Sequence, residues 1–266
     1  MLEEKLESLK EILKSLESVL IAYSGGVDST FLAKVAFDVL GDNALAVTVK
    51  SEIHPQWESA EAEDIARELG FKHETIVSDA LSIPGIAENP ANRCYYCKKE
   101  ILSELKKIAA KRGLKHVIEG SNFDDLSDHR PGMRAVIEQD VKSPLKEAKL
   151  TKAEIRELSK RLGLPTWDKP SLACLASRFP YGTKITSEKL RAVDEAEIFL
   201  RNLGIRQLRV RHHEQVARIE VPEADMETLI QNRERIVSKL KELGYSYVTM
   251  DLRGYRTGSM NEVLSS

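Results

Sequence analysis

Residues 22–30 read AYSGGVDST, and this stretch decides how the rest of the chain is interpreted. An apolar, strand-like run over residues 18–23 leads into two glycines, then an aspartate and hydroxyl side chains, before an apolar helix pattern begins. Gly25 and Gly26 have no Cβ, so backbone N–H groups can close on an anion there. The following helix would add the positive end of its dipole. The stretch therefore predicts a phosphate-binding turn at the carboxyl end of a strand.

The aspartate in this turn needs an explanation, because Asp28 would repel a bare phosphate. The turn also lacks the Gly-Lys-Ser/Thr of the Walker loop, so no lysine within it reaches a terminal phosphate. Asp28 makes sense if Mg²⁺ lies between its carboxylate and the phosphate oxygens, or if it only caps the helix. Two glycines with serines also form ordinary strand-to-helix turns, so the turn alone leaves both interpretations open.

Strand-like and helical patterns alternate through the first part of the chain. The strand-like runs are residues 18–23, 44–50, 72–77 and 115–120, and the helical patterns are 2–16, 30–40, 56–69 and 95–111. This alternation predicts an α/β fold with a mostly parallel sheet covered on both faces. A smaller α+β unit follows, with helices at 187–203 and 223–242 and strands at 206–212, 215–221 and 245–252. We expect two domains, residues 1–180 and 181–266.

The charge of the chain is close to balanced, since 40 Lys and Arg face 42 Asp and Glu. A broad nucleic-acid surface is therefore not expected, and any basic site must be local. No apolar run approaches the roughly 20 residues of a membrane span. The start, MLEEK, is charged and lacks the apolar core of a signal peptide. We expect a cytoplasmic protein that does not associate with a membrane.

Three cysteines form the second chemical feature. Cys94 and Cys97 lie in CYYC, and Cys174 lies in PSLACLASR. An odd number argues against a disulfide framework, and C-x-x-C spacing suits one metal or cluster. The spacing leaves open a [4Fe–4S] cluster on three thiolates, a structural zinc, a redox disulfide between the first two, and buried thiols. A cluster on three thiolates would leave one iron open for a further ligand such as hydrosulfide.

A charged strand face is the third feature. Arg209, Arg211 and His213 share one face of a predicted strand, while Leu208 and Val210 take the other. The charged face is either solvated or an anion site in which two arginines hold a phosphate bidentately.

Two more charged residues belong with this feature. Arg178 lies four residues after Cys174 and is a candidate for the same anion site. Glu197 is an acid/base group, a metal ligand or a surface glutamate of a helix.

The string SGGVDS resembles the pyrophosphate loop of the PP-loop ATP pyrophosphatases, which cleave ATP between its α and β phosphates. The resemblance implies a Rossmann-like domain of the adenine nucleotide α hydrolase type that binds ATP and Mg²⁺. It places the adenine against the end of the second strand, residues 47–51, and gives EGSNFDD at 119–125 a role near the nucleotide. A helix cap with solvated acids is the alternative for 119–125. The implied nucleotide-binding residues are Ala22, Ser24, Gly25, Gly26, Val27, Asp28, Ser29, Val49, Asn122 and Asp124.

A run of motifs is similar to the LarE-type sulfur transferases, which act in making the nickel-pincer nucleotide cofactor of lactate racemase. The motifs, in order along nearly the whole chain, are SGGVDS, NRCYYCKKE, EGSNFDDLSDHRPG, SPL and PSLACLASRFPYG. The resemblance implies that ATP adenylates a carboxylate of pyridinium-3,5-biscarboxylic acid mononucleotide. Sulfur from sulfide or another donor then displaces AMP and leaves a thiocarboxylate. Two such events give the dithiocarboxylate.

The family has two branches, and the cysteines separate them. One branch uses a single cysteine, matching Cys174, and gives up that sulfur. Cys94 and Cys97 make this chain look like the other branch, in which three cysteines hold a [4Fe–4S] cluster. The resemblance further implies a basic substrate-phosphate pocket. Its implied catalytic residues are Cys174, Asp28 and Glu197, and its implied phosphate-binding residues are Arg178, Arg209 and Arg211. We also expect a homo-oligomer.

Rival interpretations keep the nucleotide turn and change the rest. An amide-forming synthetase would use ammonia, which does not need three cysteines. A tRNA thiolase would favour a broad basic surface, which the near-neutral charge does not indicate. A nucleotide-binding module with a structural zinc would bind ATP without turnover.

Overall fold

The computed structural model describes residues 2–127, 131–170, 173–256 and 258–260, in two compact units. The first unit comprises Met1–Ile83 and Asn92–Leu172, and the second comprises Pro84–Ala91 and Ala173–Ser266. The sequence pattern put the division near residue 180 with all three cysteines before it, whereas Cys174 groups with the second unit. Residues 128–130 of the third motif and 171–172 of the last motif lie outside the described residues.

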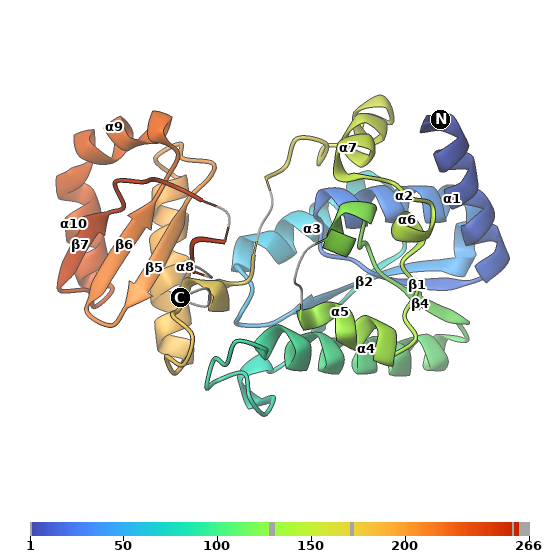
Figure 1. The fold of residues 1–266 in the computed structure, drawn as a ribbon, viewed down its shortest axis with the longest axis horizontal. Helices are drawn as coiled ribbons and strands as arrows, with labels where there is room; N and C mark the ends of the chain where they lie inside the picture. The colour runs from blue at the N-terminus through green and yellow to red at the C-terminus, as the bar shows by residue number, and fades with distance from the viewer. Residues whose placement is uncertain (1, 128–130, 171–172, 257, 261–266) are drawn as a thin grey trace. The chain divides into compact units, whose positions relative to one another are not determined.

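A four-stranded parallel sheet forms the centre of the first unit (Figure 1). Its order is β3-β2-β1-β4, with β1 (Val19–Ala22), β2 (Ala44–Lys50), β3 (His73–Val77) and β4 (His116–Ile118). The helices around it are α1 (Leu2–Leu16), α2 (Val27–Leu40), α3 (Gln56–Glu68), α4 (Arg93–Arg112), α5 (Pro131–Glu138), α6 (Pro144–Glu147) and α7 (Lys152–Arg161). The predicted α/β fold with a parallel sheet is thereby confirmed.

Apolar residues of the sheet alternate between two cores, one on each face. Val19 and Ile21 pack with α1, α2 and α7 in one core. Leu20, between them in sequence, packs with Leu102 and Leu105 of α4 on the other face. Successive strand residues point to opposite faces, so both faces of β1 are covered and β1 lies at the centre of the unit (Figure 1).

The second unit has a three-stranded mixed sheet of its own. Its order is β5-β6-β7, with β5 (Arg209–His213) antiparallel to β6 (Val216–Glu220) and β7 (Tyr247–Met250) parallel to β6. The helices of this unit are α8 (Ser187–Arg201), α9 (Glu223–Gln231) and α10 (Arg233–Glu242). The sequence pattern predicted one helix over residues 223–242, but the helix is interrupted at Asn232, whose side-chain amide donates to the Thr228 carbonyl at 2.9 Å.

The helices in the described part of the chain can be compared with the requirements for a membrane span. There, no helix combines the length and apolar character that crossing a bilayer demands.

Candidate active site

The predicted turn lies where β1 ends and α2 begins. Gly25 has φ of +67°, a conformation that L side chains rarely adopt. A Cβ on Gly25 would lie 2.7 Å from the Ala62 Cβ of α3, so no side chain fits at this position. Gly26 is the N-cap of α2, and no described side chain caps that helix end. The turn thus brings a helix N-terminus to the carboxyl edge of the sheet without a capping side chain, as an anion site requires.

The two serines of the turn bond to each other. The Ser24 and Ser29 hydroxyl oxygens are 3.0 Å apart, and the Ser29 hydroxyl also donates to the Gly26 carbonyl at 3.3 Å. The Ser24 N–H donates to the Ser29 hydroxyl at 3.3 Å. These bonds join the two ends of the loop.

Asp28, in the first turn of α2, has one satisfied and one unsatisfied oxygen. Its Oδ2 accepts from Lys152 Nζ at 2.5 Å, while its buried Oδ1 has no hydrogen-bond partner among the described residues. Burial raises the pKa of Asp28; Lys152 lowers it by less, and Asp125 raises it further. The environment therefore opposes the charge of Asp28, and a cation at Oδ1 would relieve this. The donor set of Asp28 with the nearby Asn122 and Asp125 fits Mg²⁺, which prefers oxygen ligands.

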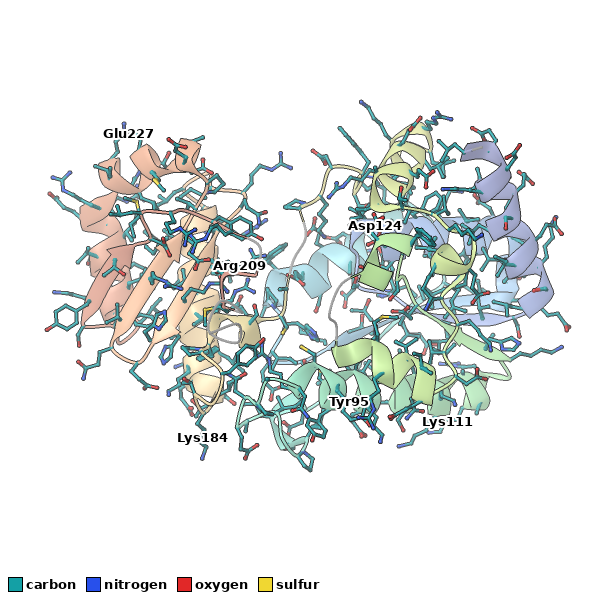
Figure 2. All side chains as sticks on the ribbon, viewed as in Figure 1. Tyr95, Lys111, Asp124, Lys184, Arg209 and Glu227 are labelled. Atoms are coloured by element: carbon teal, nitrogen blue, oxygen red, sulfur yellow. The ribbon has the colours of Figure 1, made fainter. Side chains whose placement is uncertain are left out.

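The segment after β4 approaches the start of α2 closely. A Cβ on Gly120 would lie 3.1 Å from the Ser29 backbone nitrogen. This contact places Asn122, buried, beside Asp28, where its side chain lowers the pKa of the carboxyl. Asp124 lies further along (Figure 2). Its Oδ2 accepts from the Lys152 backbone N–H at 2.8 Å. The structure thus gathers Asp28, Asn122 and Asp124, predicted as one site, at one edge of the sheet.

Sequence reasoning missed two lysines that donate to this turn. Lys152 bonds Asp28, and Lys169 Nζ donates to the Gly25 carbonyl at 3.0 Å. Both lysines follow the turn by more than a hundred residues, and no local spacing links them to it.

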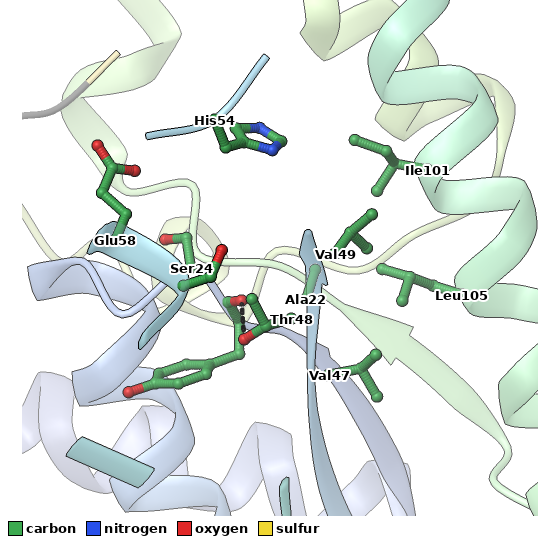
Figure 3. A pocket seen from close by; sticks show the side chains of 11 residues that line it. Ala22, Ser24, Val47, Thr48, Val49, His54, Glu58, Ile101 and Leu105 are labelled. Carbon is green, nitrogen blue, oxygen red and sulfur yellow. Dashed lines mark hydrogen bonds between the residues drawn. The ribbon is translucent and has the colours of Figure 1, made fainter. Parts of the chain in front are cut away.

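A cavity of about 160 Å³ opens beside the turn, at the carboxyl ends of β1 and β2 (Figure 3). Three predicted nucleotide-binding residues, Ala22, Ser24 and Val49, line it. The remaining lining is mixed: the apolar side chains are Val47 of β2 with Ile101 and Leu105 of α4, and the polar groups come from Tyr23, Thr48, His54, Glu58 and Ser59. Thr48 donates to the Tyr23 carbonyl at 3.0 Å. A pocket that combines apolar side chains with a few fixed polar groups suits a small-molecule ligand.

The cysteines divide between the two units. Cys94 and Cys97 lie in the first turn and a half of α4, Cys94 exposed and Cys97 partly buried. Cys174 is the N-cap residue of the short helix η4 (Leu175–Arg178) in the second unit. Among the described residues, no three His, Cys, Asp or Glu side chains are grouped so as to hold a metal ion.

Arg178 and Glu197 form a buried bidentate ion pair in the second unit. Arg178 Nε and Nη2 each donate to one Glu197 oxygen at 2.8 Å. Arg178 Nη1 also donates to the Ala173 and Cys174 carbonyls at 2.6 and 3.1 Å. Burial alone would raise the pKa of Glu197, but Arg178 and the Val210 N–H together lower it. Glu197 is buried, so it is not a surface glutamate, and its pair with Arg178 fixes the backbone around Cys174.

Arg209 and Arg211 of β5 are buried rather than solvated, each 5% exposed. Figure 2 shows the position of Arg209. Arg211 donates to Glu220 Oε2 at 2.7 Å and to the Ser177 carbonyl at 3.0 Å. Its Nε is buried with no hydrogen-bond partner in the described part of the chain. Burial and then the charge of Arg178 lower the pKa of Arg209, so these cations lie close enough to repel each other. The positive charges around Arg209 thus disfavour its own charge, an effect that a bound anion would offset.

Known proteins resemble this chain over part or nearly all of its length. The NAD synthase family pattern matches residues 1–88. An uncharacterised protein of Synechocystis is 46% identical over 267 residues, all of both chains. The pyridinium-3,5-bisthiocarboxylic acid mononucleotide synthase of Lactiplantibacillus plantarum is 41% identical over 265 residues, 99% of this chain and 96% of that one. A glutamine-hydrolysing GMP synthase of Aeropyrum pernix is 28% identical over 222 residues, 76% of this chain and 42% of the relative.

The parallel sheet, the SGGVDS turn and the NAD synthase match define an ATP-dependent enzyme of the PP-loop class. Within that class, similarity over the whole chain gives the family. The chain belongs to the LarE-type family, with the pyridinium-3,5-bisthiocarboxylic acid mononucleotide synthases.

Proposed function

We propose that this protein adenylates the carboxylates of pyridinium-3,5-biscarboxylic acid mononucleotide and converts them to thiocarboxylates, releasing AMP and pyrophosphate. The observation that carries the proposal is the 41% identity, over 99% of this chain, to a synthase of the bisthiocarboxylic product. The nucleotide turn and its adjoining cavity support the ATP half of the reaction.

Adenylation removes two obstacles to sulfur attack. A carboxylate is anionic and has a poor leaving group, so nucleophiles do not attack it. A carboxylate oxygen attacks the α-phosphorus of ATP, the bond to the β-phosphate oxygen breaks, and pyrophosphate leaves with the electron pair. A hydrosulfide then attacks the acyl carbonyl, the bond to AMP breaks, and the thiocarboxylate remains. Both steps depend on holding the partners in place.

The first unit would supply the nucleotide site. The backbone of Gly25 and Gly26 and the N-terminus of α2 would hold the phosphates. Mg²⁺, when bound at Asp28, would neutralise phosphate charge. The buried Asp28 Oδ1, which has no hydrogen-bond partner among the described residues, supports this position. The adenine would occupy the cavity beside Val47 and Val49, whose side chains pack well against a flat ring.

The second unit would hold the substrate phosphate. The positive charges of Arg178 and Arg211 lower the pKa of Arg209, and the buried Nε of Arg211 is a donor without a partner among the described residues. Arg178, the third predicted phosphate ligand, is engaged with Glu197 and with the carbonyls beside Cys174. We infer that Arg178 and Glu197 act as positioning residues for Cys174, and that Glu197 exchanges no proton, since Arg178 and the Val210 N–H occupy its oxygens.

We further propose that Cys94, Cys97 and Cys174 hold a [4Fe–4S] cluster that supplies sulfur. Cys94 and Cys97 lie three residues apart at the start of α4, so they provide a pair of thiols for one cluster. Thiolates are the ligands that such a cluster requires. Among the described residues, however, no three metal-binding side chains lie together. The cysteine pattern therefore carries the proposal.

The decisive experiment is anaerobic incubation of the full chain with ATP, sulfide and the dicarboxylate mononucleotide, followed by mass spectrometry. The expected product is heavier by the mass difference between sulfur and oxygen for each carboxylate converted, with one AMP released per conversion. Formation of AMP without a heavier product would contradict sulfur transfer. An amide product in the presence of ammonia would favour a synthetase instead.

The source of sulfur is tested by the colour and iron content of the anaerobically purified protein. The cluster proposal expects a brown protein that contains iron and acid-labile sulfide, and that converts many substrate molecules. Cys97→Ala should lose the iron and stop repeated turnover. A colourless protein that transfers one sulfur and loses the sulfur of Cys174 would establish the sacrificial route, and stoichiometric zinc without turnover would favour a binding module.

A further inference from the structure

Two lysines at the nucleotide turn are not explained by the motifs. Walker loops carry a lysine that reaches the terminal phosphates, and SGGVDS has none. An ATP site that releases pyrophosphate still has to balance the negative charge that develops on the leaving group. The structure brings Lys152 and Lys169 to the turn from two later segments of the first unit.

Lys152 is the first residue of α7, and its ammonium is the counter-ion of Asp28 at 2.5 Å. The backbone fixes its position: the Lys152 N–H donates to Asp124, and Thr151 caps α7 through a capping box with Glu154. The Lys152 side chain is 31% exposed, so the ammonium has room to move. A divalent cation at Asp28 would displace the ammonium from the carboxylate, and phosphate oxygens would then be the nearest anions to receive it.

Lys169 is held against the turn itself. Its side chain is only 10% exposed, and its ammonium contacts the Gly25 carbonyl and Glu61 Oε2, both at 3.0 Å. Arg156 of α7 fixes the segment, since its two terminal nitrogens donate to the Trp167 and Lys169 carbonyls at 2.7 and 2.8 Å. A neutral carbonyl and a half-exposed carboxylate are weak partners for a desolvated ammonium, so a phosphate group would bind it more strongly.

We propose that Lys152 and Lys169 bind the β- and γ-phosphates of ATP and stabilise the departing pyrophosphate, in place of a Walker lysine. This inference rests on the proposed ATP-dependent function. The two ammonium groups would contact the part of ATP that leaves as pyrophosphate. They should therefore contribute to the binding of ATP and pyrophosphate but not to the binding of AMP.

Equilibrium binding by calorimetry separates this role from a structural one. The ligands are pyrophosphate, ATP and AMP, each with Mg²⁺, and the proteins are the full-length wild type, Lys152→Met and Lys169→Met. Each substitution should weaken pyrophosphate and ATP binding by about ten- to hundredfold, which corresponds to about 1.4–2.8 kcal/mol. AMP binding should stay within about twofold of the wild type. Lys152→Arg should recover much of the lost affinity, because it restores the positive charge.

A matched control comes from α2 itself. Lys34 pairs with Asp38 on α2, outside the turn, so Lys34→Met should leave all three affinities unchanged. Wild-type affinity for pyrophosphate in Lys152→Met and Lys169→Met would overturn the inference. Equal losses for AMP and ATP, with a lowered unfolding temperature, would also overturn it by showing a structural role. If the wild type binds ATP but forms no thiocarboxylate, the proposed function fails while the lysine assignment stands.

Discussion

The nucleotide turn and the arginine face of β5 each contain or adjoin a buried carboxylate, Asp28 at the turn and Glu197 beside the arginines. The surroundings of the two carboxylates shift their pKa values in opposite directions. At the turn, Asp28 has a raised pKa and an unpartnered oxygen among the described residues. In the second unit, Glu197 has a lowered pKa, and both its oxygens accept hydrogen bonds from Arg178. A carboxylate whose surroundings oppose its charge is suited to receive a cation, whereas one whose surroundings support its charge holds the structure together.

The largest expected effect is on catalysis at the turn. Asp28→Asn should reduce AMP formation by about a thousandfold, because several kcal/mol of metal-dependent charge stabilisation are lost. The unfolding temperature should not fall, since the variant removes a buried charge whose surroundings oppose it. The measurement is AMP release with substrate and Mg²⁺ present, and Asp38→Asn on the same helix is the control. AMP formation at the wild-type rate would make Asp28 a helix residue without a catalytic role.

The next effect is on stability in the second unit. Glu197→Gln leaves Arg178 buried without its counter-charge and should lower the free energy of unfolding by about 3–5 kcal/mol. Glu195→Gln on the same helix removes only an exposed pair with Arg191, and should cost less than about 1 kcal/mol. Denaturant titration measures both. If both variants lost the same free energy of unfolding, the buried Arg178–Glu197 pair would contribute no more to stability than the exposed pair, and Glu197 would not hold the second unit together.

Gly25 tests how tightly the turn packs against α3. Gly25→Ala combines a positive φ with a 2.7 Å clash against Ala62, and should cost about 2–4 kcal/mol of unfolding free energy. Gly41 also has a positive φ, +53°, but a Cβ there meets no atom within 4 Å. Gly41→Ala should therefore cost only about 1 kcal/mol. Similar stability losses in the two variants would show that the turn can move away from Ala62.

The smallest effect is a pair of opposite pH dependences. The pKa of Asp28 is raised, so the wild type loses stability relative to Asp28→Asn as the pH rises past 3.8, the ordinary value. The pKa of Glu197 is lowered, so its contribution is present above its ordinary 4.5 and is lost as the pH falls. From acid to neutral pH, the stability deficit of Glu197→Gln should thus grow. Over the same range, the free energy of unfolding of Asp28→Asn should rise relative to that of the wild type. If the stabilities of the two variants, each relative to the wild type, changed with pH in the same direction, the comparison of the two carboxylates would be contradicted.

Local pattern was enough to predict the sheet of the first unit. The four predicted strands correspond to β1–β4. The apolar runs of β1 and β2 are typical of buried parallel strands, whereas β3 is the partly exposed edge strand of the sheet. The start of α2 was predicted at residue 30 but lies at Val27, since the glycine turn passes directly into the helix. The burial of Glu197 also had a sequence signal: it lies four residues after Val193 and three before Leu200, on the apolar face of α8.

Long-range contacts of the site had no such signal. Lys152 and Lys169 meet the turn only because α7 and the segment after it pack beside α2. Likewise, the alternating pattern of β5 correctly put Arg209 and Arg211 on one face but did not reveal that this face is buried. Its cover comes from residues that are distant in sequence, such as Ser259, which bonds Arg211 at 2.8 Å.

The carboxylate that follows β4 has a consequence for the thiols of α4. Glu119 accepts from Ser121 and Ser143 at 2.8 and 2.7 Å, and from Lys98 at 2.8 Å. Lys98 is the residue next to Cys97, and Ser121 precedes the Asn122 that approaches Asp28. One side chain therefore couples the nucleotide edge of the sheet mechanically to the helix that carries the thiols. We expect the reactivity of Cys97 toward an alkylating reagent to change when ATP is bound.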